Sequence, residues 1–129
     1  LSLRQMVSNS AAIFSSIYNQ GLRSRFREIS VPNTFFCRSI LFLLKREGFV
    51  LSYKITSSRN ISVIQNHSGS PFSMFIPFST RYKFLSYHQL KSAVNAGRFF
   101  ILLTPSGYIF SNFAIINKLG GALVYELKK

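Results

Sequence analysis

Acidic residues are almost absent from this sequence. The chain has 129 residues, with no Asp and only three Glu (Glu28, Glu47 and Glu126) against 16 Lys and Arg, so its formal net charge is +13. A protein this basic repels itself in isolation and needs a polyanionic partner. A phosphate backbone is the commonest such partner, because each Lys or Arg that meets a phosphate also releases condensed counterions. The charge therefore favours binding to nucleic acid.

Cysteine and long hydrophobic runs are scarce as well. Cys37 is the single cysteine, which excludes a disulfide within the chain and favours a reducing compartment. Its neighbours Phe36 and Ile40 indicate a buried, unreactive thiol. No apolar run reaches the roughly 18 residues of a membrane helix, since the run at residues 39–44 is followed directly by two basic residues.

Groups that catalyse reactions or bind metals are few and scattered. His67, His88 and the three Glu lie in different segments, whereas general acid–base catalysis needs such groups positioned together. No cluster of Cys, His and acidic residues has metal-ligand spacing, and no P-loop or dinucleotide-binding glycine pattern occurs. The sequence therefore predicts no enzyme, no metal and no cofactor, with both histidines at the surface.

Apolar and aromatic residues, by contrast, are abundant. Hydrophobic residues make up 47% of the chain, with 14 Phe and 6 Tyr. A disordered basic tail would lack the apolar surface that offsets its conformational entropy, so this chain is expected to fold. Its length suits one domain or two small halves. The elements expected along it indicate an α+β fold.

The N-terminal half is expected to have the order helix, strand, helix, strand, strand. Apolar residues at helical spacing predict a first helix that ends near Gly21. Arg23, Arg25 and Arg27 follow on alternate residues. If residues 25–31 form a strand, the three arginines line one of its faces. That face is either a solvated charged face or, as we expect in so basic a chain, a contact with RNA.

The second helix is the firmest local prediction. Pro32 suits its first turn, where the missing N–H costs nothing, and Gly48 suits the left-handed conformation that ends a helix. Residues 49–55 and 61–65 are expected to be strands. The core stripe of the helix, at positions i, i+3, i+4 and i+7, consists of Cys37, Ile40, Leu41 and Leu44.

The C-terminal half is expected to be mostly antiparallel sheet with short helices. Residues 67–71 resemble either a linker or a loop, and we place the halves at residues 1–72 and 73–129. Ser86 and Gln89 have the spacing of a capping box that opens a helix, which Gly97 stops. The expected strands are residues 74–78, 81–85, 99–103, 108–111 and 122–127, with a turn at 104–107 and a helical turn near Ala114.

The order of these pieces resembles the S-eight family of small-subunit ribosomal proteins. Val31-Pro-Asn-Thr34, a helix and Leu44-Lys-Arg-Glu-Gly-Phe-Val50 are similar to the family's Pro-Ser-Ser, helix and Leu-Lys-Glu-Glu-Gly-Phe/Tyr-Ile. Thr104-x-x-Gly107-Tyr-Ile109 stands where the family has Ser-Thr-Ser-Lys/Arg-Gly and two apolar residues. Leu119-Gly-Gly121 lies at the family's distance before the last strand, and Ser15-Ser-Ile-Tyr-Asn19 resembles the family's Thr-Arg-Ile-Arg-Asn.

The resemblance covers nearly the whole chain. It implies two small α+β halves that bind the central domain of small-subunit rRNA and help it fold during assembly. It also implies RNA contact at the matched positions, which are Ser15, Asn19, Asn33, Thr34, Thr104, Ser106, Gly107, Gly120 and Gly121. The chain departs from the family's pattern at Ser16, Tyr18, Leu103, Pro105, Ser106 and Ala122. Such drift, with a residue usage typical of A+T-rich coding, predicts an organellar and first of all mitochondrial ribosome; another organelle or the cytoplasm stays open.

Two further surfaces are predicted. Ser106 stands where the family has a basic residue, so cations from other strands are expected near the turn, with Lys83 first among them. Phe35 and Phe42 are seven residues apart and lie off the core stripe. We expect a neighbouring small-subunit protein to pack against these two rings, although singly exposed apolar side chains are ordinary.

Two other functions stay open. An RNA-modifying or RNA-processing enzyme would show turnover that depends on His67, His88 or a Glu. A basic peripheral membrane protein would need one long helix that segregates cations from aromatic residues, and the sequence has none. We therefore expect neither a membrane nor a small-molecule substrate as a partner.

Overall fold

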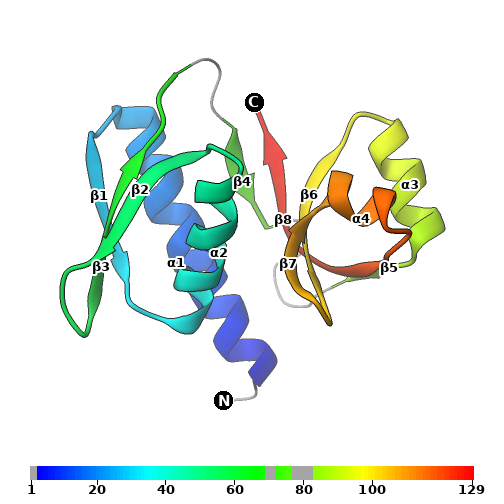
Figure 1. Ribbon diagram of the computed structural model, residues 1–129, viewed down its shortest axis with the longest axis horizontal. Helices are drawn as coiled ribbons and strands as arrows, with labels where there is room; N and C mark the ends of the chain where they lie inside the picture. The colour runs from blue at the N-terminus through cyan, green and yellow to red at the C-terminus, as the bar shows by residue number, and fades with distance from the viewer. Residues whose placement is uncertain (1–2, 69–71, 77–82) are drawn as a thin grey trace. The chain divides into compact units, whose positions relative to one another are not determined.

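The computed structural model describes residues 3–68, 72–76 and 83–129. The chain forms two compact units, Leu1–Ser73 with Lys129 and Met74–Lys128, and each has its own sheet and helices (Figure 1). The fold is α+β, as the sequence predicts. The division falls beside the expected boundary at residues 72–73.

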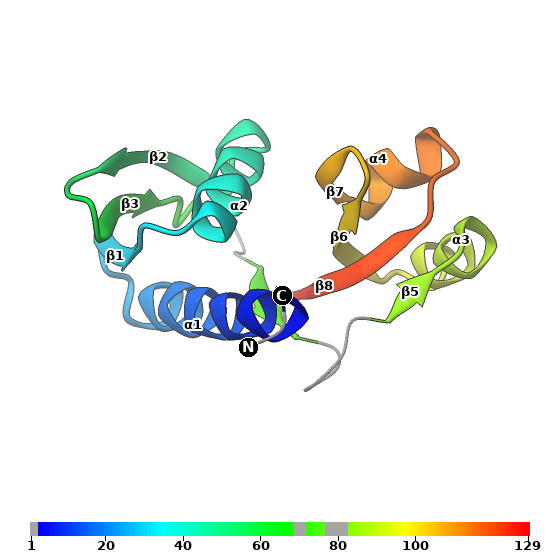
Figure 2. The same ribbon diagram turned by 90° about the horizontal axis from the view of Figure 1, so that it is seen from below.

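The N-terminal unit places two helices against a three-stranded antiparallel sheet of order β1-β3-β2. Helix α1 packs on β1 and on α2, and α2 packs on β2, as Figure 2 shows for these elements. The elements in chain order are α1 (Leu3–Ser24), β1 (Glu28–Pro32), α2 (Phe35–Arg46), β2 (Val50–Ile55) and β3 (Asn60–Gln65).

The second helix follows its local sequence closely. All four residues of the predicted stripe are buried against the sheet and α1. The Thr34 hydroxyl caps the helix by accepting a hydrogen bond of 3.1 Å from the Cys37 N–H. Gly48 takes the left-handed conformation with φ +84°. Burial raises the pKa of the Cys37 thiol, which agrees with the unreactive buried cysteine expected from the sequence.

Two expectations for the N-terminal unit are wrong. Helix α1 continues to Ser24 and β1 begins only at Glu28, so residues 25–31 are not one strand and the three arginines do not share a strand face. Pro32 ends β1 instead of opening α2. Strand β1 lies at the edge of the sheet, where a residue without an N–H is tolerated.

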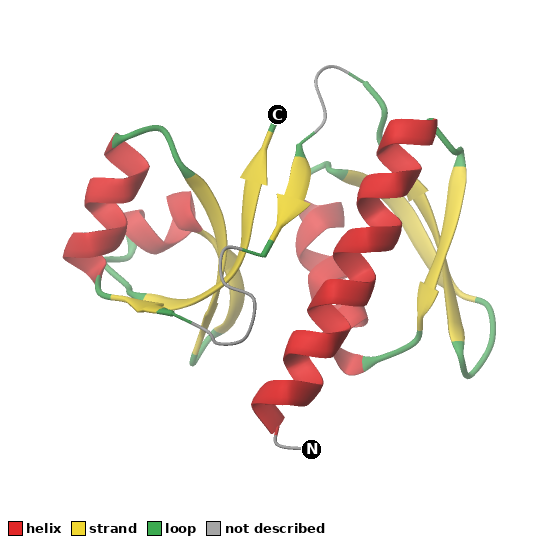
Figure 3. Cartoon of the chain, turned by 180° about the vertical axis from the view of Figure 1, so that it is seen from behind, coloured by secondary structure: helices red, strands yellow, loops and turns green. Residues whose placement is uncertain are grey.

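The C-terminal unit has a sheet of order β4-β8-β6-β7, and β5 also pairs with β8. Its helices α3 and α4 contact each other and lie on the same side of the strands (Figure 3). Some residues of the strands expected at 74–78 and 81–85 lie outside the described ones. The elements are β4 (Ser73–Phe75), β5 (Phe84–Leu85), α3 (Tyr87–Asn95), β6 (Phe99–Thr104), β7 (Gly107–Phe110), α4 (Ser111–Ile116) and β8 (Gly121–Lys128).

The core of this unit lies between its helices and its sheet. The capping box of α3 is confirmed, with Ser86 and Gln89 bonding to each other's backbone N–H. Ser111 opens α4 instead of ending a strand, and its buried hydroxyl accepts a hydrogen bond of 3.1 Å from the Phe100 N–H. One cluster of buried residues in this core consists of Leu85, Leu90, Phe100, Leu102, Ile109, Ala114 and Leu123.

Candidate nucleic-acid interface

Most of the positive charge has no acidic partner. In the described part of the chain, the ion pairs are Arg46 with Glu47 at 3.5 Å and Arg98 with Glu126 at 3.0 Å. The carboxylate of Glu28 accepts a hydrogen bond from the Ser62 hydroxyl. All three glutamate carboxylates are therefore engaged within the chain, and they are far fewer than its 16 Lys and Arg side chains.

The four helices of the described chain end in the same way. After the last helical turn, one residue takes a left-handed conformation. Its N–H and the N–H of the following residue donate hydrogen bonds to carbonyl groups at the end of the helix. In α2 and α3 this residue is Gly48 and Gly97, with φ of +84° and +88°. Glycine suits the position because it has no Cβ.

In α1 and α4 the same position holds a cation. Arg25 has φ +53° and Lys118 has φ +55°. The N–H after Arg25 donates to the Gly21 carbonyl at 3.0 Å, and the N–H after Lys118 donates to the Ala114 carbonyl at 2.8 Å. A side chain in this conformation costs about 1–2 kcal/mol, while a cation at a helix C-terminus returns about 0.3–1 kcal/mol. Glycine in turn loses about 0.5–1 kcal/mol more conformational entropy on folding, so these terms nearly cancel and stability alone does not favour a cation over glycine at these two positions.

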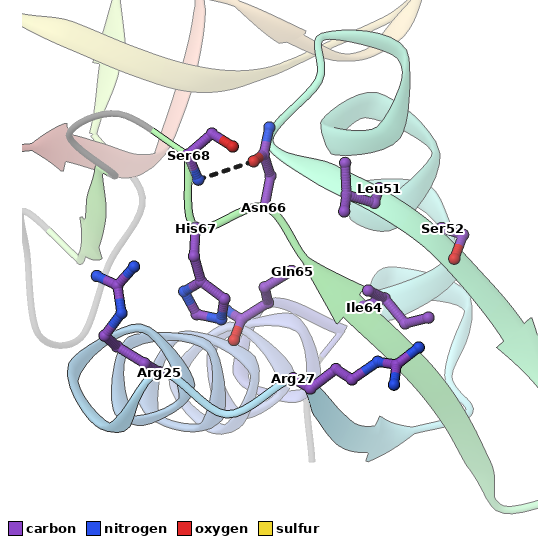
Figure 4. Close-up of a pocket in the computed structure, with 9 residues that line it drawn as sticks. All are labelled: Arg25, Arg27, Leu51, Ser52, Ile64, Gln65, Asn66, His67 and Ser68. Carbon is purple, nitrogen blue, oxygen red and sulfur yellow. Dashed lines mark hydrogen bonds between the residues drawn. The ribbon is translucent and has the colours of Figure 1, made fainter.

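Arg25 and Arg27 line an open groove of about 700 Å³ on the N-terminal unit. Figure 4 shows the two side chains extending on either side of the His67 ring. Both arginines are exposed, and neither side chain has an acidic partner within the described residues. The other lining residues come from β2, β3 and the segment after β3, and they are Leu51, Ser52, Ile64, Gln65, Asn66, His67 and Ser68.

Hydrogen bonds hold the segment after β3 in place beside the arginines. The His67 Nε2 lies 2.7 Å from the Phe26 carbonyl oxygen, so this ring nitrogen donates. The Asn66 amide donates to the Gly48 carbonyl at 2.9 Å and accepts from the Ser68 N–H at 2.9 Å. His67 lies in the loop after β3, as expected, and is half-buried against the chain, whereas His88 is exposed.

The family-matched residues of the N-terminal unit serve the fold first. The Ser15 side chain is buried, and its hydroxyl donates to the Ala12 carbonyl at 3.2 Å. The Asn33 amide donates to the carbonyls of Ser57 and Ser58, at 3.3 and 3.4 Å. With Thr34 occupied as the cap of α2, these internal bonds explain the residue types without RNA. Asn19 is half-buried on α1.

The turn between β6 and β7 is held by the Thr104 hydroxyl. This hydroxyl donates to the Gly107 carbonyl at 2.9 Å and accepts from the Ser106 N–H at 3.2 Å, and the residue is buried. Gly107 has φ +106°, which a β-branched side chain rarely adopts. Since Thr104 already donates inside the turn, the side chain that remains for a ligand is the exposed Ser106 hydroxyl.

Gly121 lets the backbone pack closely beside this turn, and Gly120 lets it pack closely beside the end of β5. A Cβ on Gly121 would lie 2.9 Å from the Leu103 carbonyl oxygen and 3.0 Å from Thr104 Cγ2, and a Cβ on Gly120 would lie 2.5 Å from the Leu85 carbonyl oxygen. The turn and the two glycines therefore lie at the same end of the C-terminal sheet, where Gly121 touches Thr104. Lys118 lies in the connection that leads to these glycines.

Lys83 lies on the far side of β8 from the turn. Its carbonyl accepts a hydrogen bond of 2.8 Å from the Leu123 N–H, while the opposite edge of β8 pairs with β6. Its predicted role as the first cation beside the turn stays a prediction. Lys118 is a second candidate, which the sequence did not reveal because its left-handed conformation follows from the structure.

The two phenylalanines of α2 are exposed, as predicted. Phe35 is 74% and Phe42 62% accessible, so neither ring belongs to the core of the N-terminal unit. The neighbouring protein expected to cover them stays a prediction.

No protein-family model matches the chain, and no curated protein matches it as a relative. Among the described residues, no helix is long and apolar enough to cross a membrane. The same part of the chain contains no group of three or more His, Cys, Asp or Glu side chains that could hold a metal ion.

Proposed function

We propose that this protein is a structural, non-enzymatic constituent of the small ribosomal subunit, first of all of a mitochondrial ribosome. In this role it binds the central domain of small-subunit rRNA and helps that RNA fold during assembly. The observation that carries the proposal is a folded α+β chain of net charge +13 whose three carboxylates are all engaged within it. The choice of small-subunit rRNA as the bound RNA rests on the sequence resemblance to the S-eight family.

The described side chains suit two kinds of RNA contact that such a role requires, which supports the proposal. Arginine side chains such as those of Arg25 and Arg27, which have no acidic partner among the described residues, suit phosphate oxygens and would position the protein without reading sequence. Hydroxyl and backbone groups at a tight turn, as at Ser106 and Gly107, suit the sugar and base edges of folded RNA. The former kind lies in the N-terminal unit and the latter in the C-terminal unit.

An enzymatic role has less support. His67 and His88 belong to different units, and the Nε2 of His67 is held by the Phe26 carbonyl. The carboxylates are bonded to Ser62, Arg46 and Arg98. Turnover of RNA that disappears on substitution of either histidine would favour an RNA-processing enzyme and contradict this proposal.

Purification of the tagged protein from its native source, followed by sequencing of the bound RNA, tests the proposal directly. We expect small-subunit rRNA, with contacts enriched in its central domain, in fractions that sediment with the small subunit. Binding to a transcript of that domain should weaken steeply with salt, with a slope of log K against log salt steeper than about −3, since each phosphate contributes roughly −0.7 to −0.9. A flat salt dependence, or recovery with vesicles after RNase treatment, would contradict the proposal.

A further inference from the structure

We propose that Arg25 and Lys118 are phosphate anchors, one in each unit, and that they occupy the left-handed ends of α1 and α4 because RNA binding requires a cation there. This inference rests on the proposed function and names two of the residues that carry it. It follows from a comparison of four equivalent positions within one chain, of which two hold glycine and two hold a cation.

The backbone at Arg25 is held by hydrogen bonds, whereas its side chain is exposed. The backbone around it is held by the Phe26 N–H, which donates to the Gly21 carbonyl at 3.0 Å, and by the Phe26 carbonyl, which lies 2.7 Å from His67 Nε2. The guanidinium is exposed and extends beside the groove that Arg27 also lines (Figure 4). A planar guanidinium on a fixed backbone suits a phosphate, to which it donates two parallel hydrogen bonds.

Lys118 has the corresponding setting in the C-terminal unit. Its side chain is exposed, and among the described residues no carboxylate pairs with it. The chain after it runs into Gly120, where a Cβ would meet the Leu85 carbonyl oxygen, and Gly121, which lies against Leu103 and Thr104 at the start of the turn. Lys118 leads into the end of β8 that pairs with the turn end of β6, so this cation and the Ser106 hydroxyl belong to the same end of the C-terminal sheet.

The simpler interpretation is that both cations only complement the negative end of a helix dipole. Helix α2 shows that this does not require the left-handed position, because Lys45 and Arg46 lie in its last turn and Gly48 still follows. Helix α3 has no basic residue in its last turn and also ends at glycine. A cation has replaced glycine only at the two ends that lie beside candidate RNA contacts.

The test replaces each cation by the residue that the backbone favours. Arg25→Gly, Lys118→Gly and the double variant are compared with wild type by thermal unfolding and by titration with a labelled transcript of the rRNA central domain at several salt concentrations. Lys91→Gln, which removes an exposed charge from α3, controls for net charge, and Gly48→Lys controls for an added cation in the same conformation.

We expect each glycine variant to keep the Tm of the wild type or exceed it, because the left-handed strain is relieved. Each should nevertheless make the salt slope shallower by about 0.7–0.9, and the double variant by about twice that amount. Lys91→Gln should change the slope less than either glycine variant, and Gly48→Lys should lower the Tm without steepening the slope.

Three outcomes would overturn the inference. If the wild type shows a steep salt slope that both glycine variants retain, Arg25 and Lys118 are not phosphate anchors, although the proposed function stands. If the wild type shows no salt dependence, the proposed function fails and this inference fails with it. If the glycine variants and Arg25→Asn, which also tolerates the left-handed conformation, all lose thermal stability, the cations serve the fold instead of RNA.

Discussion

The guanidinium of Arg98 forms two hydrogen bonds of 3.0 Å with the carboxylate of Glu126. The pair joins the residue that precedes β6 to the far end of β8, and Arg98 also lies 4.9 Å from the centre of the Phe100 ring. These hydrogen bonds are the main reason that the pKa of Glu126 is lowered. One of the three Glu carboxylates of this basic chain therefore stabilises the fold by binding Arg98.

The pair should make stability depend on pH on the acid side. Because the folded pKa of Glu126 lies below the unfolded value, the stabilisation is complete above the unfolded pKa of about 4.3. It is lost as the pH falls through the folded pKa. Glu126→Gln should lower the Tm at pH 7 and flatten the fall in Tm below about pH 4.3, as followed by circular dichroism. If the Tm of this variant fell with pH as steeply as that of the wild type, other groups would control stability in acid.

Removal of the other partner should cost more stability than removal of the charge from Glu126. Arg98→Met leaves a carboxylate that is only 8% accessible without its donors, which typically costs about 1–3 kcal/mol. The free energy of unfolding is measured by urea denaturation at neutral pH. Lys91→Met, on the exposed surface of α3, is the matched control and should change stability by no more than about 0.5 kcal/mol.

Gly21 should be intolerant of any side chain. A Cβ at this position would overlap the Gln65 Oε1 and lie 2.7 Å from Ile29 Cγ2, while the Gln65 amide is held by the Tyr18 carbonyl at 2.9 Å. We expect Gly21→Ala to lower the free energy of unfolding by about 1–3 kcal/mol, as overpacking does. If the overlap with Gln65 is the cause, the cost should shrink in a Gln65→Ala background. An equal cost in both backgrounds would implicate Ile29 instead.

The turn at Thr104–Gly107 should separate folding from RNA recognition. Gly107→Val should destabilise the protein by about 1–3 kcal/mol, although space is open around a Cβ there, because the cost is conformational. Ser106→Ala should leave stability unchanged and weaken binding to the cognate rRNA more than to an unrelated RNA, whereas Arg25→Gly should weaken both about equally. Identical effects of the Ser106 and Arg25 variants on the two RNAs would reduce the turn to a hairpin connection.

Phe35 and Phe42 should matter only in the assembled particle. Both rings are exposed, so the double variant Phe35→Ser, Phe42→Ser should change the free energy of unfolding by no more than about 0.5 kcal/mol. Its fraction in small subunits, measured by sedimentation, should fall if a neighbouring protein packs on this face of α2. Ile116→Ser, at a position that is 78% accessible on α4, is the control. Equal incorporation of both variants and the wild type would contradict the predicted interface.

Features fixed by neighbouring residues could be predicted from the sequence. The capping box of Ser86 and Gln89 and the left-handed glycines Gly48 and Gly97 each depend on signals within one helical turn. The end of α1 could not be predicted, because Arg25 stands where glycine would have marked it. The first helix was therefore expected to end too early, and the following strand to begin too early.

The candidate site was predictable only in part for a related reason. Arg25 and Arg27 were identified from their charge, but the groove between them depends on His67, which meets Phe26 across 41 residues of sequence. No local pattern reveals that contact. Thr104 was expected to face RNA, whereas in the structure its hydroxyl forms two hydrogen bonds within the turn.

The central place of β8 sets the order in which the two units can be completed during synthesis. The N-terminal sheet is finished once β3 has emerged, whereas β4, β5 and β6 all pair with β8, which is translated after them. Until residues 121–128 leave the translating ribosome, β6 has only the β7 hairpin as a partner and keeps an open edge, which favours aggregation. The N-terminal unit, with Arg25 and Arg27, can therefore fold first. The turn at residues 104–107 comes to lie beside Gly121 only when β8 joins the sheet.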